Sequence, residues 1–159
     1  MAKSIFLAVV FGIFLNLNAG ASMVSFFVIE TGLPEEGGNN RHSQYWESAF
    51  MDVFFDAGHI VCNFPIQRLQ SKPEGEILRA ISFDMDDARS AGVDFVFITY
   101  LDYNPDSMMP AEISFFIFKV NSREKILERR IAGKTYGSTR EEVDDLKSIV
   151  RGLVPFIRE

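Results

Sequence analysis

Three polar residues near the middle of the chain have types and spacing that could bind a divalent cation. Asp52, Asp56 and His59 follow one another at positions i, i+4 and i+7, which share one face of a helix. Carboxylates and imidazoles are common ligands of transition metals. However, Gly58 is typical of a helix end and would turn His59 away from the two acids. We therefore expect a solvated helix face here and no metal site.

Other candidate catalytic patterns lack a component. Cys62 is the only cysteine, and a thiol nucleophile with His42 or His59 as its base is one interpretation. Its position in a short extended segment favours a buried structural cysteine. The GxSxG and HExxH motifs are absent. The acids of FDMDDARSAG lack the spacing of a calcium loop, and we expect Asp86 to pair with Arg89 on an exposed helix face.

The segment ETGLPEEGGNNRHSQYW, residues 30 to 46, resembles a small-molecule site because it contains two adjacent glycines. A phosphate-binding loop needs a lysine directly after its glycines, and a dinucleotide site needs three spaced glycines. Neither pattern is present, and Glu30, Glu35 and Glu36 would repel phosphate oxygens. We interpret the segment as a strand-to-helix connector that could also contact a protein partner, with an anion site as the weakest of the three interpretations.

Two loops, residues 31–42 and 103–111, supply the candidates for contact with a partner, because binding residues lie on loops more often than on regular elements. Exposed methionines at the second loop would form an adaptable apolar surface. The alternative is that both methionines pack under the loop and close one end of the core. The predicted contact residues are Glu35, Glu36, Asn39, Asn40, His42, Met108 and Met109.

The N-terminal 21 residues have the layout of a secretory signal peptide. Lys3 precedes an apolar run from Ile5 to Leu15, and small residues surround the expected cleavage point after Ala21. The run is short for a membrane span, which needs about 20 apolar residues. We predict a periplasmic or secreted protein, and the open alternative is that the segment is kept as an anchor.

The amino-acid composition limits the remaining classes of structure and function. With 159 residues, of which 47% are hydrophobic and 24% charged, the chain fits one globular domain, here residues 22–159. The formal net charge is −6, and it becomes −7 without Lys3. Such an acidic chain argues against nucleic-acid binding. A single cysteine excludes an intramolecular disulfide and zinc sites with several thiolates, and we expect no cofactor.

Hydrophobic periodicity predicts a single α/β (α+β) domain with a mixed sheet of about five strands and three helices, in the order β-α-β-α-β-β-β-α. Pro65 suggests a sheet edge or a strand end, and Pro155 is expected to kink the last helix. Ser138 or Thr139, followed by acids three residues later, predicts a capping box. The strands are expected at 23–31, 59–69, 93–103, 112–120 and 125–133, and the helices at 43–58, 72–92 and 137–159.

The passages WESAFMDVFFDAGHIV, ILRAISFDMDDARSAGVDFVFITYLDY and ISFFIFKVNSREKILERRI, followed by an amphipathic helix, resemble the α/β module shared by the N-terminal domain of TolB, by LpoB and by CsgG-type envelope proteins. The matching positions are Ala57-Gly58 and the segment AGVDFV at 91 to 96, with Thr99 where the family often has a small residue. The resemblance covers most of residues 23 to 157. The chain departs from the family in having no lipobox cysteine and no following propeller.

This resemblance implies a non-enzymatic envelope role through protein contacts, and it supplies no catalytic residues. Our leading hypothesis is an envelope-protein partner bound by loop 31–42, loop 103–111 or a sheet edge. The alternative is a small secreted hydrolase or metal-dependent enzyme using Asp52, Asp56, His59 or His42, which requires two or more of those side chains to converge within about 3 Å of one point. A ligand-binding sensor with an apolar cavity is a third possibility.

Overall fold

The computed structural model describes residues 20–33, 40–70, 77–80, 83–104 and 107–157. The predicted signal peptide lies outside these ranges except for Gly20 and Ala21, and so do the predicted contacts Glu35, Glu36 and Asn39. Within the described ranges, no helix is both long and apolar enough to cross a membrane.

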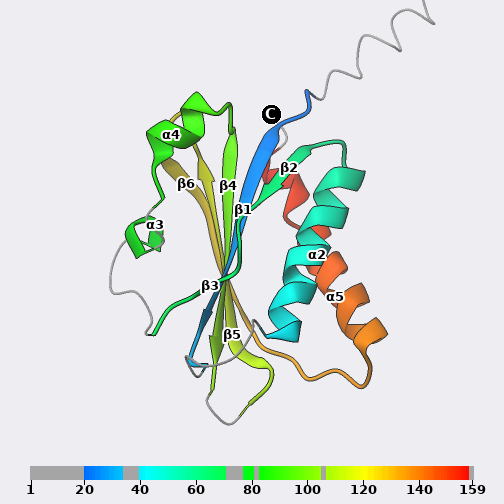
Figure 1. Ribbon diagram of the computed structural model, residues 1–159. Coiled ribbons are helices and arrows are strands. Elements are labelled where there is room, and N and C mark those ends of the chain that lie inside the picture. The colour runs from blue at the N-terminus through cyan, green and yellow to red at the C-terminus, as the bar shows by residue number, and fades with distance from the viewer. Residues whose placement is uncertain (1–19, 34–39, 71–76, 81–82, 105–106, 158–159) are drawn as a thin grey trace, which may run out of the picture.

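A six-stranded mixed sheet forms the centre of the domain (Figure 1). The first strand, β1, is parallel to β2, β3 and β4, whereas β4, β5 and β6 form an antiparallel meander. The order across the sheet is β2-β1-β4-β5-β6, with β3 beside β1. The strands are β1 (Met23–Thr31), β2 (Ile60–Asn63), β3 (Gln67–Arg68), β4 (Phe95–Tyr103), β5 (Pro110–Lys119) and β6 (Glu124–Ala132).

Helices cover both faces of this sheet, so the mixed α/β architecture predicted from the sequence is confirmed (Figure 1). One face packs against α2 and α5, and the opposite face packs against α3 and α4. The helices are α2 (Arg41–Asp56), α3 (Ile77–Ala80), α4 (Met85–Ser90), α5 (Thr139–Arg151) and the 3-10 helix η1 (Val154–Ile157).

Aromatic side chains hold α2 on its face of the sheet. The ring of Phe26 in β1 stacks on Phe50 with 5.5 Å between centroids, and Phe97 in β4 meets Phe54 edge-on at 4.8 Å. Trp46 lies 5.4 Å from the ring of Phe115 in β5. Buried aromatic pairs of this kind add stability beyond the area that they bury, so α2 is fixed against three neighbouring strands.

The predicted strand 59–69 is two strands in the structure. Pro65 has no backbone N–H to donate, and β2 ends two residues before it while β3 begins two residues after it. Both short strands pair with β1. The sheet therefore has one strand more than the five that the sequence predicted.

The predicted helix 72–92 is wrong as a single element. Asp84 has an extended backbone, and its Oδ1 accepts hydrogen bonds from the N–H groups of Asp86 at 2.7 Å and Asp87 at 3.2 Å. This is N-cap geometry, so α4 starts anew after Asp84. Apolar periodicity continues across the break because Ile77 and Ala88 still bury against the same sheet face.

The other helix ends follow their sequence signals. Gly58 and Gly92 both have positive φ values, of 87° and 80°, and each follows the C-cap residue of its helix, α2 or α4. Ser138 accepts a hydrogen bond from the N–H of Glu141 at 3.2 Å, which confirms the predicted N-cap. The Glu141 carboxylate reaches back to the N–H of Gly137, at 3.0 Å, and not to Ser138. The chain continues past α5 as η1, which contains Pro155.

Candidate interaction surface

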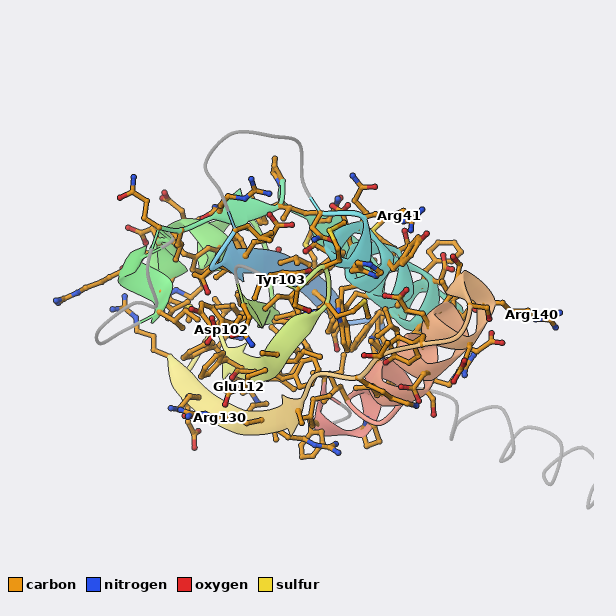
Figure 2. All side chains as sticks on the ribbon, turned by 90° about the horizontal axis from the view of Figure 1, so that it is seen from below. Arg41, Asp102, Tyr103, Glu112, Arg130 and Arg140 are labelled. Atoms are coloured by element: carbon orange, nitrogen blue, oxygen red, sulfur yellow. The ribbon has the colours of Figure 1, made fainter. Side chains whose placement is uncertain are left out.

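The candidate site lies at the carboxyl ends of the parallel strands β1 and β4. The chain leaves β1 toward α2 on one face of the sheet, and it arrives at β4 from α4 on the other face. The carboxyl end of β4 leads directly into the antiparallel strand β5, so the connections from β1 to α2 and from β4 to β5 both start at this end of the sheet. Figure 2 looks onto this end, with Asp102 and Tyr103 at the end of β4 and Arg41 and Arg140 at the starts of α2 and α5.

The structure brings the two predicted contact loops together at this end. The Asn40 side-chain amide donates a hydrogen bond to the backbone carbonyl of Met108, with 3.3 Å between nitrogen and oxygen. Asn40 also caps α2, because its Oδ1 accepts from the N–H of His42 at 2.8 Å. The connector is therefore shorter than predicted, and His42 lies in the first turn of α2 and not in a loop.

The two methionines have different environments. Met108 is 71% exposed, so the alternative interpretation, in which both methionines pack under the loop, does not hold for it. Met109 is half-buried, and its backbone N–H and carbonyl both bond to the Ser107 hydroxyl, at 3.1 and 2.9 Å. That local turn presents the Met108 side chain to solvent. We call the described predicted contacts, Asn40, His42, Met108 and Met109, the end surface.

A buried ion pair supports the end surface from below. Glu30 has no exposed surface, and its Oε2 accepts from Arg68 Nη2 at 2.7 Å and Nε at 3.0 Å. Its other oxygen accepts from the N–H of Asn40 at 2.9 Å. The expectation that Glu30 is a loop charge that repels anions is therefore wrong, because both of its oxygens face protein donors.

A second polar cluster joins α2 to α5 and β4. His42 Nδ1 lies 2.6 Å from Glu142 Oε1, and the hydroxyl groups of Ser43 and Tyr103 lie 2.8 Å apart. A histidine beside an acid is part of many hydrolase sites. Here the neighbouring Ser43 is fully buried and bonded to Tyr103, not to His42. The arrangement locks three elements together and presents no serine nucleophile to the imidazole.

The tyrosines at the end of β4 are held in their neutral form. Burial raises the pKa of the Tyr103 phenol well above its usual value, and the charges of Glu30 and Glu142 raise it further, against the lowering effect of the Ser43 hydrogen bond. Burial likewise raises the pKa of Tyr100. Its hydroxyl lies 2.7 Å from Thr31 Oγ1, which donates to Asp102 at 3.1 Å. These phenols therefore serve as hydrogen-bonding groups at neutral pH.

The residues of the alternative enzyme hypothesis do not converge. Asp52 pairs with Lys147 at 2.6 Å, and His59 packs against Phe54 beyond the end of α2. His42 lies at the other end of α2, about 21 Å from Asp56 along the helix axis. In the part of the chain that the structure describes, no group of three His, Cys, Asp or Glu side chains is placed to hold a metal ion.

Cys62 is half-buried in the edge strand β2, so the expectation of a fully buried cysteine is only partly met. Its register partner is Ser25 of β1. On α4, the predicted pair of Asp86 and Arg89 is confirmed, with 2.7 Å between the carboxylate oxygen and the guanidinium nitrogen.

The most important residues whose role was not recognised from the sequence are the buried acids. Glu142 precedes the buried Leu146 by four residues, so it lies on the apolar stripe of α5. That position was a usable signal, because an acid on a buried stripe requires a partner. Glu30 offered a weaker signal, since its partner Arg68 is distant in the sequence and separated by a broken strand.

No protein-family model and no curated protein sequence matches the chain. Among solved structures, a single-substitution variant of the PelC dodecamer from Paraburkholderia phytofirmans is similar over 87% of this chain and 90% of that chain, with 10% identity and a TM-score of 0.50. TolB from Acinetobacter baumannii is similar over 86% of this chain and 27% of that chain, with 11% identity and a TM-score of 0.44. The LpoB C-terminal domain from Salmonella enterica is similar over 79% and 92%, with 10% identity and a TM-score of 0.40.

TolB and LpoB, whose module the sequence pattern resembles, are thus both among the structures that this chain resembles. At identities near 10%, the likeness to PelC concerns the fold alone.

Proposed function

We propose that the chain is a non-enzymatic interaction module of the cell envelope, periplasmic or secreted, that binds a protein partner through the end surface. The observation that carries this proposal is the hydrogen bond from Asn40 to Met108, which joins two loops into one surface with an exposed methionine beside it. Methionine is enriched in protein interfaces relative to the rest of the protein surface.

The support beneath the surface strengthens the proposal. Glu30, Arg68, Ser43 and Tyr103 hold the ends of β1, β3, β4 and the start of α2 through buried hydrogen bonds. A surface fixed in this way loses little conformational entropy when it binds. The envelope location rests on the predicted signal peptide and on the resemblance of the sequence to envelope modules. The dispersal of Asp52, Asp56, His59 and His42 favours this function over the alternative hydrolase.

Site-specific photo-crosslinking tests the proposal in the native host. A photoreactive amino acid replaces Met108 in one strain and Phe55 in a second, because Phe55 is equally exposed, at 74%, but lies on the outer side of α2. We expect a discrete protein adduct from position 108 and none of the same mass from position 55. PelC is described as a dodecamer, so an adduct with a second copy of this chain is one form that the result can take.

A second variant separates a true contact from chance proximity. Asn40→Asp removes the amide that donates to the Met108 carbonyl and keeps a side-chain oxygen that can cap α2, so the adduct from position 108 should weaken at equal protein abundance. Adducts of equal yield at positions 108 and 55, or no adduct at position 108, would contradict an interface at the end surface.

A further inference from the structure

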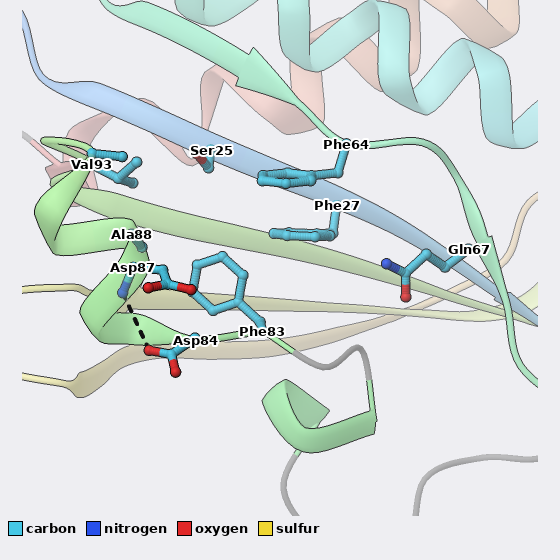
Figure 3. A pocket seen from close by; sticks show the side chains of 10 residues that line it. Ser25, Phe27, Phe64, Gln67, Phe83, Asp84, Asp87, Ala88 and Val93 are labelled. Carbon is cyan, nitrogen blue, oxygen red and sulfur yellow. Dashed lines mark hydrogen bonds between the residues drawn. The ribbon is translucent and has the colours of Figure 1, made fainter.

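An apolar pocket lies on the opposite part of the molecule, between the amino-terminal half of β1 and α4 (Figure 3). Its volume is about 360 Å³, within the range of small-molecule sites. Val93 and Ala88 form one wall, and Ser25 contributes the hydroxyl of a nearly fully buried side chain. None of the residues of the end surface lines this pocket.

Three phenylalanines form the opposite wall. The rings of Phe27 and Phe64 stack with 4.2 Å between centroids and 8° between planes, and Phe83 meets Phe27 edge-on at 5.3 Å. Phe64 keeps 39% of its surface exposed although it is a large apolar residue. Because Phe27 and Phe64 cover each other's inner faces, these two rings offer a ligand apolar contact. Ring faces carry negative partial charge and attract cations, and the Phe83 ring lies beside the acids of α4 (Figure 3).

Two carboxylates add negative charge to the pocket. Asp84 and Asp87 line the pocket beside Phe83, as Figure 3 shows. Asp84 uses one oxygen to cap α4, whereas the described residues offer the Asp87 carboxylate neither a hydrogen bond nor an ion pair. Two nearby arginines, Arg89 and Arg123, both bind Asp86. Among the described lining residues there is no lysine or arginine.

We propose that this pocket binds a small organic cation, an ammonium group on an apolar body. The body packs between Phe27, Phe64 and the wall formed by Val93 and Ala88. The ammonium group lies at the rim, between the Phe83 ring and the Asp87 carboxylate. An anion of the same shape is rejected, because its charge would lie at the rim beside two carboxylates of the same sign.

The test uses three probes of nearly equal shape: 2-phenylethylammonium, neutral 2-phenylethanol and anionic phenylacetate. NMR titration of the full folded chain up to 10 mM reports affinity and, through the methyl signals of Ala88, Ala91 and Val93, location. We expect saturable shifts of these methyl groups with the cation, binding about ten-fold weaker for the alcohol, as expected when a cation–π contact and a charge pair are lost, and no binding of phenylacetate.

Matched variants assign the selectivity to named groups. Asp87→Asn should bring the affinity for the cation close to that for the alcohol, whereas Asp144→Asn, which makes the same charge change on the exposed part of α5, should leave it unchanged. Phe64→Leu should weaken both ligands, and Phe55→Leu, at an exposed site outside the pocket, should weaken neither.

Absence of saturable shifts with the cation at 10 mM would overturn the proposal. Equal affinity for cation and alcohol, or an Asp87→Asn variant that keeps the preference for the cation, would also overturn it. Because these outcomes are read in the wild-type fold or in surface variants, loss of folding does not confuse the result.

Discussion

Glu30 shows how one residue determines the architecture of the end surface. A carboxylate with no exposed surface is costly to bury unless its oxygens are satisfied, and here Arg68 and the N–H of Asn40 satisfy both. The same side chain therefore fixes the short strand β3 beside β1 and the start of α2. If Arg68 is removed, the carboxylate remains in a buried site that has lost its cationic partner.

Arg68→Met should therefore lower the free energy of unfolding by about 3 kcal/mol, at the low end for broken buried pairs, because the Arg68 side chain keeps 18% exposure. Urea denaturation followed by circular dichroism measures this loss. The double variant Arg68→Met with Glu30→Gln should recover much of it, since a neutral amide can still accept from Asn40. A loss equal in the single and double variants would show that the charge is not the cause.

At the scale of elements, two glycines with similar backbones have different roles. Gly32 follows β1 with φ of 77°, and a Cβ there would lie 1.8 Å from the carbonyl oxygen of Tyr103. Gly58 follows α2 with φ of 87°, and a Cβ there would meet nothing within 4 Å. Gly58 is therefore needed only for its positive φ, whereas Gly32 also permits the close approach of β1 to the end of β4.

Comparison of Gly58→Ala with Gly32→Ala separates these two effects. Gly58→Ala should cost about 1–2 kcal/mol, the penalty for a left-handed alanine. Gly32→Ala should cost clearly more, because a backbone carbonyl cannot move aside as a flexible side chain can. The midpoints of urea unfolding provide the comparison, and equal shifts in the two variants would contradict a close approach at Gly32.

The same scale shows what could be read from the sequence. Strands β1, β4, β5 and β6 and helices α2 and α5 were predictable because their patterns extend over nine or more residues. The break at Asp84 was missed, since apolar residues on both sides keep one period while the N-cap depends on local backbone geometry. For the end surface, the loops were predictable as candidates, but their contact through Asn40 and Met108 depends on the sheet order.

For the whole molecule, the perturbed tyrosines predict how the fold responds to alkali. Burial raises the pKa of Tyr100, Tyr103 and Tyr136 above that of an exposed phenol, and a hydrogen bond from Tyr136 to Asp145 raises the last one further. In the unfolded chain the phenols ionise near pH 10. The folded state keeps protons that the unfolded state releases, so the stability contributed by these groups is complete below pH 10 and is lost as the pH rises above it.

The free energy of unfolding should therefore fall above pH 10 by up to about 1.4 kcal/mol per pH unit for each phenol that stays protonated. Tyr103→Phe should remove the contribution of one phenol to this slope. It should also lower the free energy of unfolding at neutral pH, because the hydrogen bond with Ser43 is lost. Urea unfolding measured between pH 8 and 11 gives both values. An unchanged slope in the variant would show that Tyr103 ionises equally in both states.

The position of β1 also constrains the biosynthesis of the protein. This strand is the earliest element described in the chain, yet it lies inside the sheet between β2 and β4. Its register with β4 pairs Val24 with Phe95, about 70 residues later. The β5–β6 hairpin, by contrast, pairs neighbouring segments. Distant pairing is slow, and the aromatic segment SFFVI at 25 to 29 is synthesised long before β4 exists. Until β4 is complete, this segment is therefore an unpaired apolar strand that is prone to aggregate.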